Sequence, residues 1–239
     1  MRRLFCLPFA GGGAVTYRLW HRTLPDDIEV VAAMLPGREA RLNEAPLTSV
    51  AAMVDDLLPS VLAASDMPYA IFGHSMGALV AFELAKALER SGGRPPSQLF
   101  VSARRSPDEP ETRAPMHALP EPAFLDEMQR RYGGIPAEVR AERELLDLLL
   151  PTLRADTCAF ETYAMSAGPA VRCPVHVYGG VDDAHPTPAQ LPAWERALGR
   201  PVRVRVFAGD HFYLNAQRDT LTADIAEQWQ PDVAPVLPS

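Results

Sequence analysis

The segment Tyr69–Glu89, YAIFGHSMGALVAFELAKALE, decides the fold. A short apolar run leads into Gly73-His74-Ser75-Met76-Gly77, and a long amphipathic pattern follows. This spacing predicts a strand over 69–72, a sharp turn at Ser75 and a helix over 76–89. The serine of such a turn takes a strained backbone, and glycines two residues to either side avoid collisions. The pattern G-x-S-x-G alone also fits an ordinary strand–helix turn with a capping serine.

The rest of the chain alternates in the same way between apolar runs and helical patterns. The apolar runs predict further strands over 4–9, 28–35, 99–103, 175–178 and 202–207. Further helices are predicted over 49–64, 188–198 and 220–229. Strands that alternate with helices are typical of an α/β protein with a mostly parallel central sheet flanked by helices.

One region, at about residues 104–168, interrupts this alternation. It opens with the proline-rich and charged stretch RRSPDEPETRAP and continues with helical patterns over 121–132, 137–150 and 151–166. About 65 residues form a poor hydrophobic core by themselves. We therefore expect residues 1–239 to form a single domain, with a helical lid inserted between two strands at about 104–168.

Composition excludes several classes of function. The net charge of −7 argues against nucleic acid as the main partner, because phosphate binding needs a basic surface. The three cysteines are too few and too scattered for a disulfide framework or a zinc site. No apolar run reaches the ~18 residues of a membrane span, and the N-terminal run is too short for a signal peptide. The sequence thus predicts a cytoplasmic protein with no metal and no membrane contact.

Downstream of Ser75, acidic residues and a histidine each follow a late strand. The α/β-hydrolase fold has the chain order Ser, then Asp or Glu, then His. His211 follows the last predicted strand and is the expected base; His185 is its rival. In many enzymes of this fold the orienting acid comes three residues after a glycine that ends the strand. Counting from Gly180 gives Asp183, and counting from Gly179 gives Asp182. Asp183 is preferred, and Asp182 remains the alternative.

An oxyanion formed at Ser75 would need two backbone donors. The first expected donor is the N–H of Met76, the residue after the serine. The second is the N–H of Phe9 or Ala10, in the glycine-rich loop after the first strand. The same loop lacks G-x-G-x-x-G and G-K-[ST], which argues against a nucleotide site.

Several motifs resemble those of one enzyme family in the expected order. They are LPFAGGGA from Leu7, LPGRE from Leu35, FGHSMGA from Phe72, RRYGGIP from Arg130, GGVDD from Gly179 and GDHFYL from Gly209. Together they make the chain similar to the type II thioesterases, the free-standing editing enzymes of polyketide and nonribosomal peptide assembly lines. One departure is Ala184-His185, where many relatives carry proline.

This resemblance implies an α/β-hydrolase core with a helical lid. It implies hydrolysis, without a cofactor, of acyl groups held as thioesters on the phosphopantetheine arm of an acyl carrier or peptidyl carrier protein. It also implies Ser75 as nucleophile, His211 as base and Asp183 as orienting acid. We expect the enzyme to act as a monomer.

Two groups of residues in the insertion have a predicted role. Phe124, Met128, Tyr132 and Ile135 are expected to line an acyl chamber or the entry of the arm; alternatively they fix the lid to the core. The second group is a basic docking patch for an acidic carrier, or else a solvated face: Arg104, Arg105, Arg113, Arg130 and Arg131.

Two other functions remain compatible with the motifs. A carboxylesterase acting on small oxygen esters would use the same three residues. An α/β-hydrolase used only for binding is a further alternative, although such proteins usually lose one residue of the triad.

Overall fold

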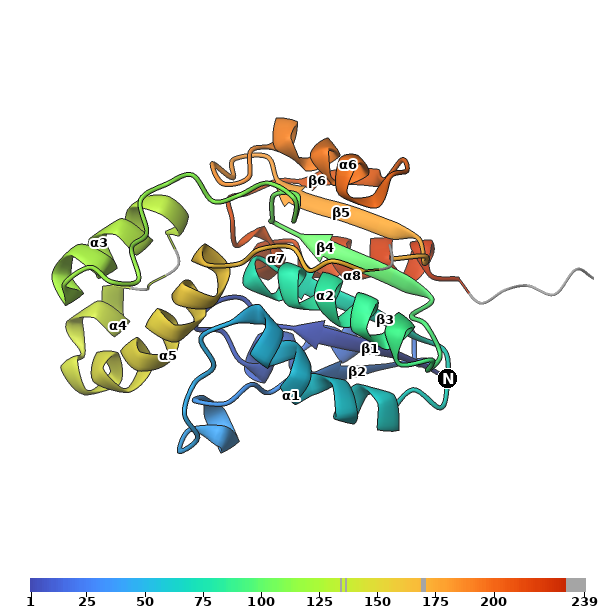
Figure 1. The fold of residues 1–239 in the computed structure, drawn as a ribbon, viewed down its shortest axis with the longest axis horizontal. Helices are drawn as coiled ribbons and strands as arrows, with labels where there is room; N and C mark the ends of the chain where they lie inside the picture. Colours follow the sequence, from blue (N-terminus) through green and yellow to red (C-terminus); the bar gives the residue numbers. More distant parts are fainter. Residues whose placement is uncertain (134, 136, 169–170, 231–239) are drawn as a thin grey trace, which may run out of the picture.

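The computed structural model describes residues 1–133, 135, 137–168 and 171–230. Within these residues six strands form one sheet in the order β2-β1-β3-β4-β5-β6, and all neighbours run parallel (Figure 1). The strands are β1 (Arg2–Leu7), β2 (Ile28–Ala32), β3 (Tyr69–His74), β4 (Gln98–Ser102), β5 (Val175–Gly180) and β6 (Arg203–Phe207). The predicted α/β class with a mostly parallel sheet is confirmed.

Burial along the strands follows their place in the sheet. Every residue of the central strand β3 is buried, because helices cover both faces of a parallel sheet. The edge strand β6 is largely open, and of its five residues only Phe207 is buried. Continuous apolar runs in the sequence therefore mark the centre of the sheet, where Ser75 follows β3.

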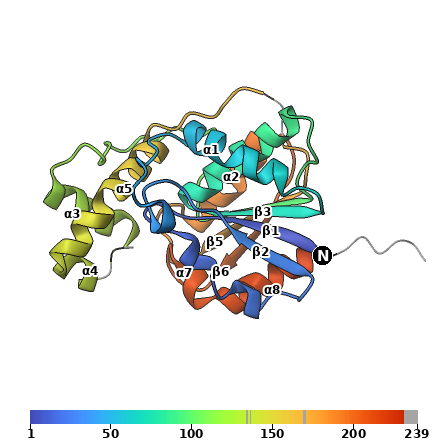
Figure 2. The same ribbon diagram turned by 90° about the horizontal axis from the view of Figure 1, so that it is seen from below.

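Helices pack against both faces of the sheet. Figure 2 shows α1 (Val50–Ala63) and α2 (Met76–Arg90) on one side, and α7 (Tyr213–Ala216) and α8 (Arg218–Gln228) on the other. Residues of α6 (Trp194–Leu198) belong to the core on the α2 side, where Trp194 meets Phe82 at 5.6 Å between ring centroids. Short 3-10 helices span Ala14–Tyr17, Trp20–Arg22, Glu39–Arg41 and Pro188–Ala193.

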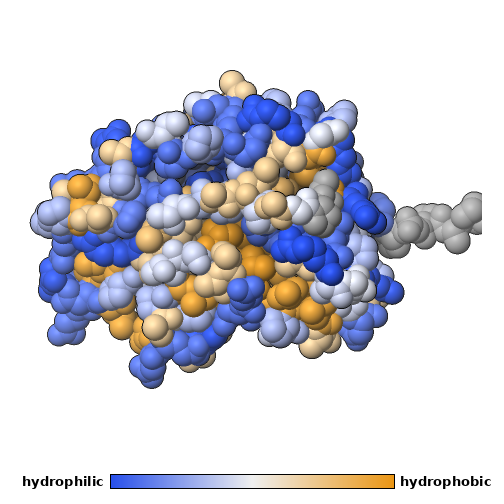
Figure 3. Space-filling model, in the orientation of Figure 1, coloured by the Kyte–Doolittle hydropathy of each residue, from blue (hydrophilic) through white to orange (hydrophobic). Residues whose placement is uncertain are grey.

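Three helices lie between β4 and β5, in the segment 104–168 that we call the lid region. They are α3 (Glu121–Tyr132), α4 (Ala137–Ala141) and α5 (Arg143–Glu161), and they stand at the carboxyl edge of the sheet (Figures 1 and 2). Figure 3 shows apolar surface over these helices, and α5 exposes Leu145, Leu148 and Leu149. The lid helices thus bury only part of their apolar side chains.

The boundaries of the lid helices differ from those expected. The sequence predicted a break between Leu150 and Pro151, but the break falls at Glu142 and α5 runs through Pro151. A proline inside a helix removes one backbone hydrogen bond and costs about 3 kcal/mol. Leu146, Ala155 and Phe160 are buried on either side of Pro151, and their packing offsets that cost.

Two features are absent from the described part of the chain. It holds no helix long and apolar enough to cross a membrane. Among the same residues, no three His, Cys, Asp or Glu side chains are grouped as metal ligands.

Helix α2 approaches the end of β1 closely enough to need a glycine. A Cβ added to Gly77 would lie 2.3 Å from the carbonyl oxygen of Leu7 and 2.7 Å from that of Pro8. Such contacts are far inside van der Waals distance, so a side chain here would push the helix away from the strand. This approach brings the start of α2 beside the loop that follows β1.

We expect Gly77→Ala to lower the free energy of unfolding by about 3 kcal/mol, the upper range of overpacking costs, because the new methyl group meets backbone atoms. The measurement is urea denaturation at constant m-value. Gly199→Ala is the control: its Cβ meets nothing within 4 Å, although its φ is +64°. That left-handed conformation costs an alanine about 1 kcal/mol. Equal losses in the two variants would contradict the close approach.

Candidate functional site

Ser75 occupies the turn between β3 and α2 in a strained conformation. Its φ of 55° and ψ of −114° are unusual for a residue with a side chain. A Cβ on Gly73 would lie 2.1 Å from the carbonyl oxygen of Gly77, so the turn can close only between two glycines. The predicted sharp turn is present.

The structure brings Ser75, His211 and Asp183 into one hydrogen-bonded chain. The Nε2 atom of His211 lies 2.9 Å from Ser75 Oγ, and its Nδ1 atom lies 2.8 Å from Asp183 Oδ2. All three residues are buried, with exposed fractions of 8% or less. A carboxylate at Nδ1 favours the tautomer that leaves Nε2 free to accept a proton from the serine hydroxyl.

Of the two neighbouring acids, Asp183 is the one that contacts the histidine. Its second oxygen, Oδ1, accepts a hydrogen bond from the backbone N–H of His185 at 2.8 Å, which fixes the carboxylate. The side chain of Asp182 is exposed, and its N–H donates to the carbonyl of Gly209 at 2.9 Å. The loop after β5 and the loop after β6 lie very close together. A Cβ on Gly180 would be only 2.3 Å from the carbonyl oxygen of Asp210, so this position needs a glycine.

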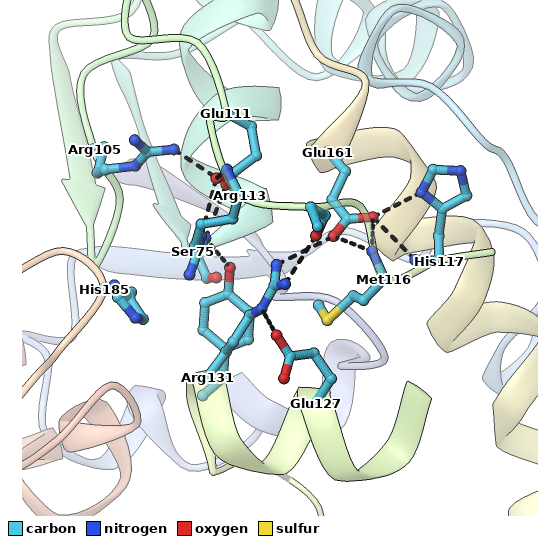
Figure 4. A network of polar contacts seen from close by, with 12 residues as sticks. Ser75, Arg105, Glu111, Arg113, Met116, His117, Glu127, Arg131, Glu161 and His185 are labelled. Atoms are coloured by element: carbon cyan, nitrogen blue, oxygen red, sulfur yellow. Dashed lines mark hydrogen bonds and ion pairs between the residues drawn. The ribbon is translucent and has the colours of Figure 1, made fainter. Parts of the chain in front are cut away.

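The rival histidine, His185, is not part of this chain. In Figure 4 its ring stands apart from Ser75, and no hydrogen bond of the described residues joins the two side chains. His185 instead contributes its backbone N–H to Asp183.

An uncharged hydrogen-bonded network lies next to His211. The Nδ1 atom of His74 lies 2.8 Å from Ser102 Oγ, which in turn lies 2.6 Å from the hydroxyl of Tyr213. The rings of His74 and His211 are 5.4 Å apart. Burial holds the pKa of His74 well below its usual 6.5, and the neighbouring His211 lowers it further. His74 is therefore neutral and adds no positive charge behind His211.

The expected oxyanion donors lie at the junction of α2 and the loop after β1. Met76 is the first residue of α2, and Phe9 and Ala10 follow β1. Within the described residues, the N–H groups of Met76, Phe9 and Ala10 have no protein acceptor. The N-terminus of the 15-residue helix α2 also favours negative charge at this point.

An apolar cavity of about 170 Å³ adjoins the loop after β1 at residues 9–11. Its lining residues are Phe9, Ala10, Gly11, Ile135, Val139, Leu146, Leu149, Leu150 and Leu153. It lies between the loop after β1 and the helices α4 and α5, so leucine side chains of α5 form one of its walls.

The four lid residues singled out from the sequence fall into separate environments. Ile135 lines the apolar cavity. Tyr132 places its ring 5.1 Å from that of His211. Phe124 and Met128 do not border this cavity; they are buried in the core that joins the lid to α2. Ile135 and Tyr132 therefore border the cavity and His211 while also packing against this core, and Phe124 and Met128 lie within the core.

The five arginines expected to form a docking patch do not share an open surface. Glu111 accepts from Arg105 at 3.1 Å and from Arg113 at 2.8 Å, and Arg113 also donates to the hydroxyl of Tyr132 (Figure 4). Arg131 is buried and donates to Glu127 at 2.6 Å.

Of the remaining two, Arg104 stacks over the ring of Phe160 at 5.3 Å. Only Arg130 is mostly exposed, at 65%. The segment therefore uses its arginines chiefly for internal ion pairs.

Two charged residues beside the loop after β1 lie outside the set of site residues that the sequence predicts. Arg38 and Asp156 form a buried ion pair, with 2.8 Å between Nη2 and Oδ1. Arg38 belongs to the LPGRE motif, which carries the family resemblance but predicts no role for the arginine itself. Asp156 lies in the helical insertion and carried no signal that distinguished it from other acids.

Comparison with known proteins identifies the family. Residues 2–229 match the model of the Thioesterase domain. The chain belongs to the thioesterase family. Gramicidin S biosynthesis protein GrsT of Aneurinibacillus migulanus is 36% identical, over 98% of this chain and 91% of that protein. Thioesterase PikA5 of Streptomyces venezuelae is 37% identical, over 94% and 80% of the two chains.

A solved structure agrees with these sequence relatives. The type II thioesterase BorB from the borrelidin biosynthetic cluster superposes with a TM-score of 0.82 at 37% identity, covering 95% of this chain and 90% of that one. The resemblance to type II thioesterases is confirmed. The relatives favour an editing thioesterase over a carboxylesterase or a non-catalytic binding protein.

The low pKa of His74 predicts a specific dependence of stability on pH. An unfolded histidine takes up a proton near pH 6.5, whereas the folded form resists it. The stability that neutral His74 supports is therefore present above about pH 6.5 and is lost as the pH falls.

We expect wild type to lose stability more steeply than His74→Asn between pH 7 and 5, by up to about 1.4 kcal/mol per pH unit. The measurement is urea denaturation of both proteins at matched pH values. Other buried groups, including His176 with its pKa lowered to about 4, are common to both and cancel in the difference. Parallel curves would show that His74 does not resist protonation.

Proposed function

We propose that this protein is an editing thioesterase that hydrolyses acyl groups from the phosphopantetheine arm of an acyl carrier or peptidyl carrier protein. The observation that carries the proposal is the hydrogen-bonded chain from Ser75 through His211 to Asp183. Family membership supports thioester hydrolysis. The names of the relatives, which refer to gramicidin S and borrelidin biosynthesis, support a role beside an assembly line.

In the proposed reaction Ser75 Oγ attacks the thioester carbonyl carbon while His211 Nε2 takes the hydroxyl proton. The negative charge that develops on the carbonyl oxygen accepts hydrogen bonds from Met76 N–H and from Phe9 or Ala10 N–H. The carbon–sulfur bond then breaks, and the thiol of the arm leaves with the proton returned by His211.

The acyl-serine ester is hydrolysed by the same groups in a second round. His211 removes a proton from water, which attacks the ester carbon, and the serine leaves with that proton as the acid is released. Asp183 holds the ring of His211 and stabilises its positive charge in both rounds. No electron transfer or metal ion takes part in these steps.

The lid region gives the acyl group a place in this proposal. We assign the apolar cavity between the oxyanion loop and α5 to the acyl chain, because it begins at Phe9 and Ala10 and is lined by leucines. Tyr132, close to His211, borders the approach to Ser75. Residues 104–168 would then act as a lid on a single α/β-hydrolase domain.

Single substitutions in the triad test the roles directly. Ser75→Ala should abolish hydrolysis of acyl-pantetheine, because no other group can form the acyl intermediate. Asp183→Asn should lower kcat by roughly 10³–10⁴-fold, because the amide favours the wrong tautomer of His211. The exposed Asp182 provides the matched control, and Asp182→Asn should stay within about twofold of wild type by the same reasoning. The roles are wrong if Asp182→Asn alone loses activity.

The substrate class needs a separate comparison. We expect the wild-type enzyme to release the same acyl group faster from pantetheine than from a matched oxygen ester, and faster again from a carrier protein. Mass spectrometry of the acylated carrier and a thiol assay for free acyl-pantetheine measure the rates. Preference for the oxygen ester would indicate a carboxylesterase, and equal rates on free and carrier-bound thioesters would exclude recognition of the carrier.

A further inference from the structure

The loop that would receive the oxyanion, residues 9–13, is held by two charged side chains from distant parts of the chain. Asp156 of α5 accepts the N–H of Gly11 on its Oδ2 atom at 2.7 Å. Arg38 donates from Nη1 to the carbonyl of Gly12 at 2.9 Å. The first bond falls on the Ala10–Gly11 peptide unit, directly after Ala10, and the second falls on the Gly12–Gly13 unit.

The two side chains also bind each other in a bidentate pair. Arg38 Nη1 lies 2.9 Å from Asp156 Oδ2, and Nη2 lies 2.8 Å from Oδ1. Their side chains are 6% and 0% exposed. The planar fork of an arginine matches a carboxylate in this way and leaves little freedom in either group. Arg38 and Asp156 therefore form a rigid unit that binds the loop twice, with Arg38 as a donor and Asp156 as an acceptor.

Other residues of the LPGRE motif also hydrogen-bond to the loop or to the lid region. Glu39 accepts the N–H groups of Ala14 and Val15, both at 2.9 Å, at the far end of the loop. A Cβ on Gly13 would lie 2.5 Å from the carboxylate of Glu39, so the loop passes directly over it. Thr152 of α5 donates to the carbonyl of Gly37 at 2.6 Å, which joins the motif to the lid.

A buried ion pair contributes little to stability, but it can fix the positions of the two side chains and of the groups they bind. Apolar residues of similar size often stabilise a fold as well as such a pair does, because taking two charges out of water is costly. Three consecutive glycines, by contrast, give the loop little conformational preference of its own. Donors to an oxyanion act only when they are held in place before the reaction.

We propose that Arg38 and Asp156 are positioning residues that hold the oxyanion loop in its catalytic conformation, and that this is the task of the arginine in the LPGRE motif. The pair acts through Gly11 and Gly12 on the N–H groups of Phe9 and Ala10. Since Asp156 belongs to α5, the geometry of the oxyanion site depends on the lid helix being seated. The inference rests on the proposed function, because it concerns the same reaction.

The decisive experiment replaces the whole pair by apolar residues, in the double variant Arg38→Met/Asp156→Leu. If the pair positions the loop, kcat for acyl-pantetheine should fall at least about tenfold while KM changes less than about threefold. The melting temperature should stay near that of wild type, since no charge is left buried alone. The proposal would be overturned if the double variant kept both the melting temperature and the kcat of wild type.

An inhibitor that imitates the charged intermediate gives a second readout. An alkylboronic acid forms a tetrahedral anionic adduct with an active serine, so it needs the oxyanion donors more than the substrate does. Its inhibition constant should rise in the double variant by about the same factor by which kcat/KM falls. An unchanged constant would mean that the loop keeps its conformation without the pair.

A second buried ion pair supplies the matched control. Lys86 and Glu83 of α2 are 4% and 7% exposed, and they bond to Tyr163 and Ser166 and not to the oxyanion loop. Glu83→Leu/Lys86→Met should therefore leave kcat within about twofold of wild type. A loss equal to that of the first double variant would show that any buried pair of this fold has the same effect, and would overturn the proposal.

A milder comparison covers the case in which the double variant does not fold. Asp156→Asn keeps an oxygen that can accept the N–H of Gly11, whereas Asp156→Ala does not, and both remove the ion pair. The alanine variant should lose more kcat than the asparagine variant; equal losses would contradict the role of the Gly11 bond. The proposed function fails separately, if wild type itself hydrolyses no thioester.

Discussion

The backbone of α2 touches the backbone of β1 at Gly77, and the geometry of the site depends on that contact. The carbonyls of Leu7 and Pro8 leave no room for a Cβ at this position. This contact brings Met76, the first residue of α2, beside the loop of Phe9 and Ala10. The turn holds Ser75 at a positive φ, with its Oγ 2.9 Å from His211 Nε2. Gly73 and Gly77 thus permit the turn that places Ser75 beside the proposed oxyanion donors.

The opposite side of the site depends on electrostatics more than on packing. Asp183 is fixed by His185 N–H and holds His211, while the neutral His74, Ser102 and Tyr213 fill the space behind the ring. In the proposed mechanism, a protonated His74 would repel the positive charge that forms on the neighbouring imidazole. Burial lowers the pKa of His74 and so keeps a second positive charge away from that ring.

Charged side chains in the lid region serve internal structure more than they serve the surface. The side chain of Glu161 is 1% exposed and accepts the N–H groups of Met116 and His117, and Glu111 joins Arg105 to Arg113 (Figure 4). These pairs fasten long proline-containing segments that have few backbone hydrogen bonds of their own. Four of the five arginines predicted to form a docking patch are in ion pairs, and among the five only Arg130 is mostly exposed. Leu145, Leu148 and Leu149 of α5 are exposed as well.

The sequence by itself determined the features that depend on near neighbours. Apolar runs and helical periods gave the strands, the order of the elements and the turn at Ser75, because both periodicities arise within a few residues. The order of serine, acid and histidine limited the other site residues to short loops after β5 and β6. The local signal could not choose between Asp182 and Asp183, which differ by one position. The turn after Gly180 decides that Asp183 is buried against His211 while Asp182 faces solvent.

Contacts between residues far apart in the chain could be assigned only from the folded structure. Arg38 and Asp156 are 118 positions apart, and no period or motif in the chain connects them. The same is true of the division of the lid residues, where Tyr132 and Ile135 border His211 and the cavity while Phe124 and Met128 lie within the core. Their sequence spacing fits one helical face, but which face meets the core depends on how α3 and α5 pack. Such pairings follow from the shape of the whole assembled core, and that shape is not encoded in any short stretch of the chain.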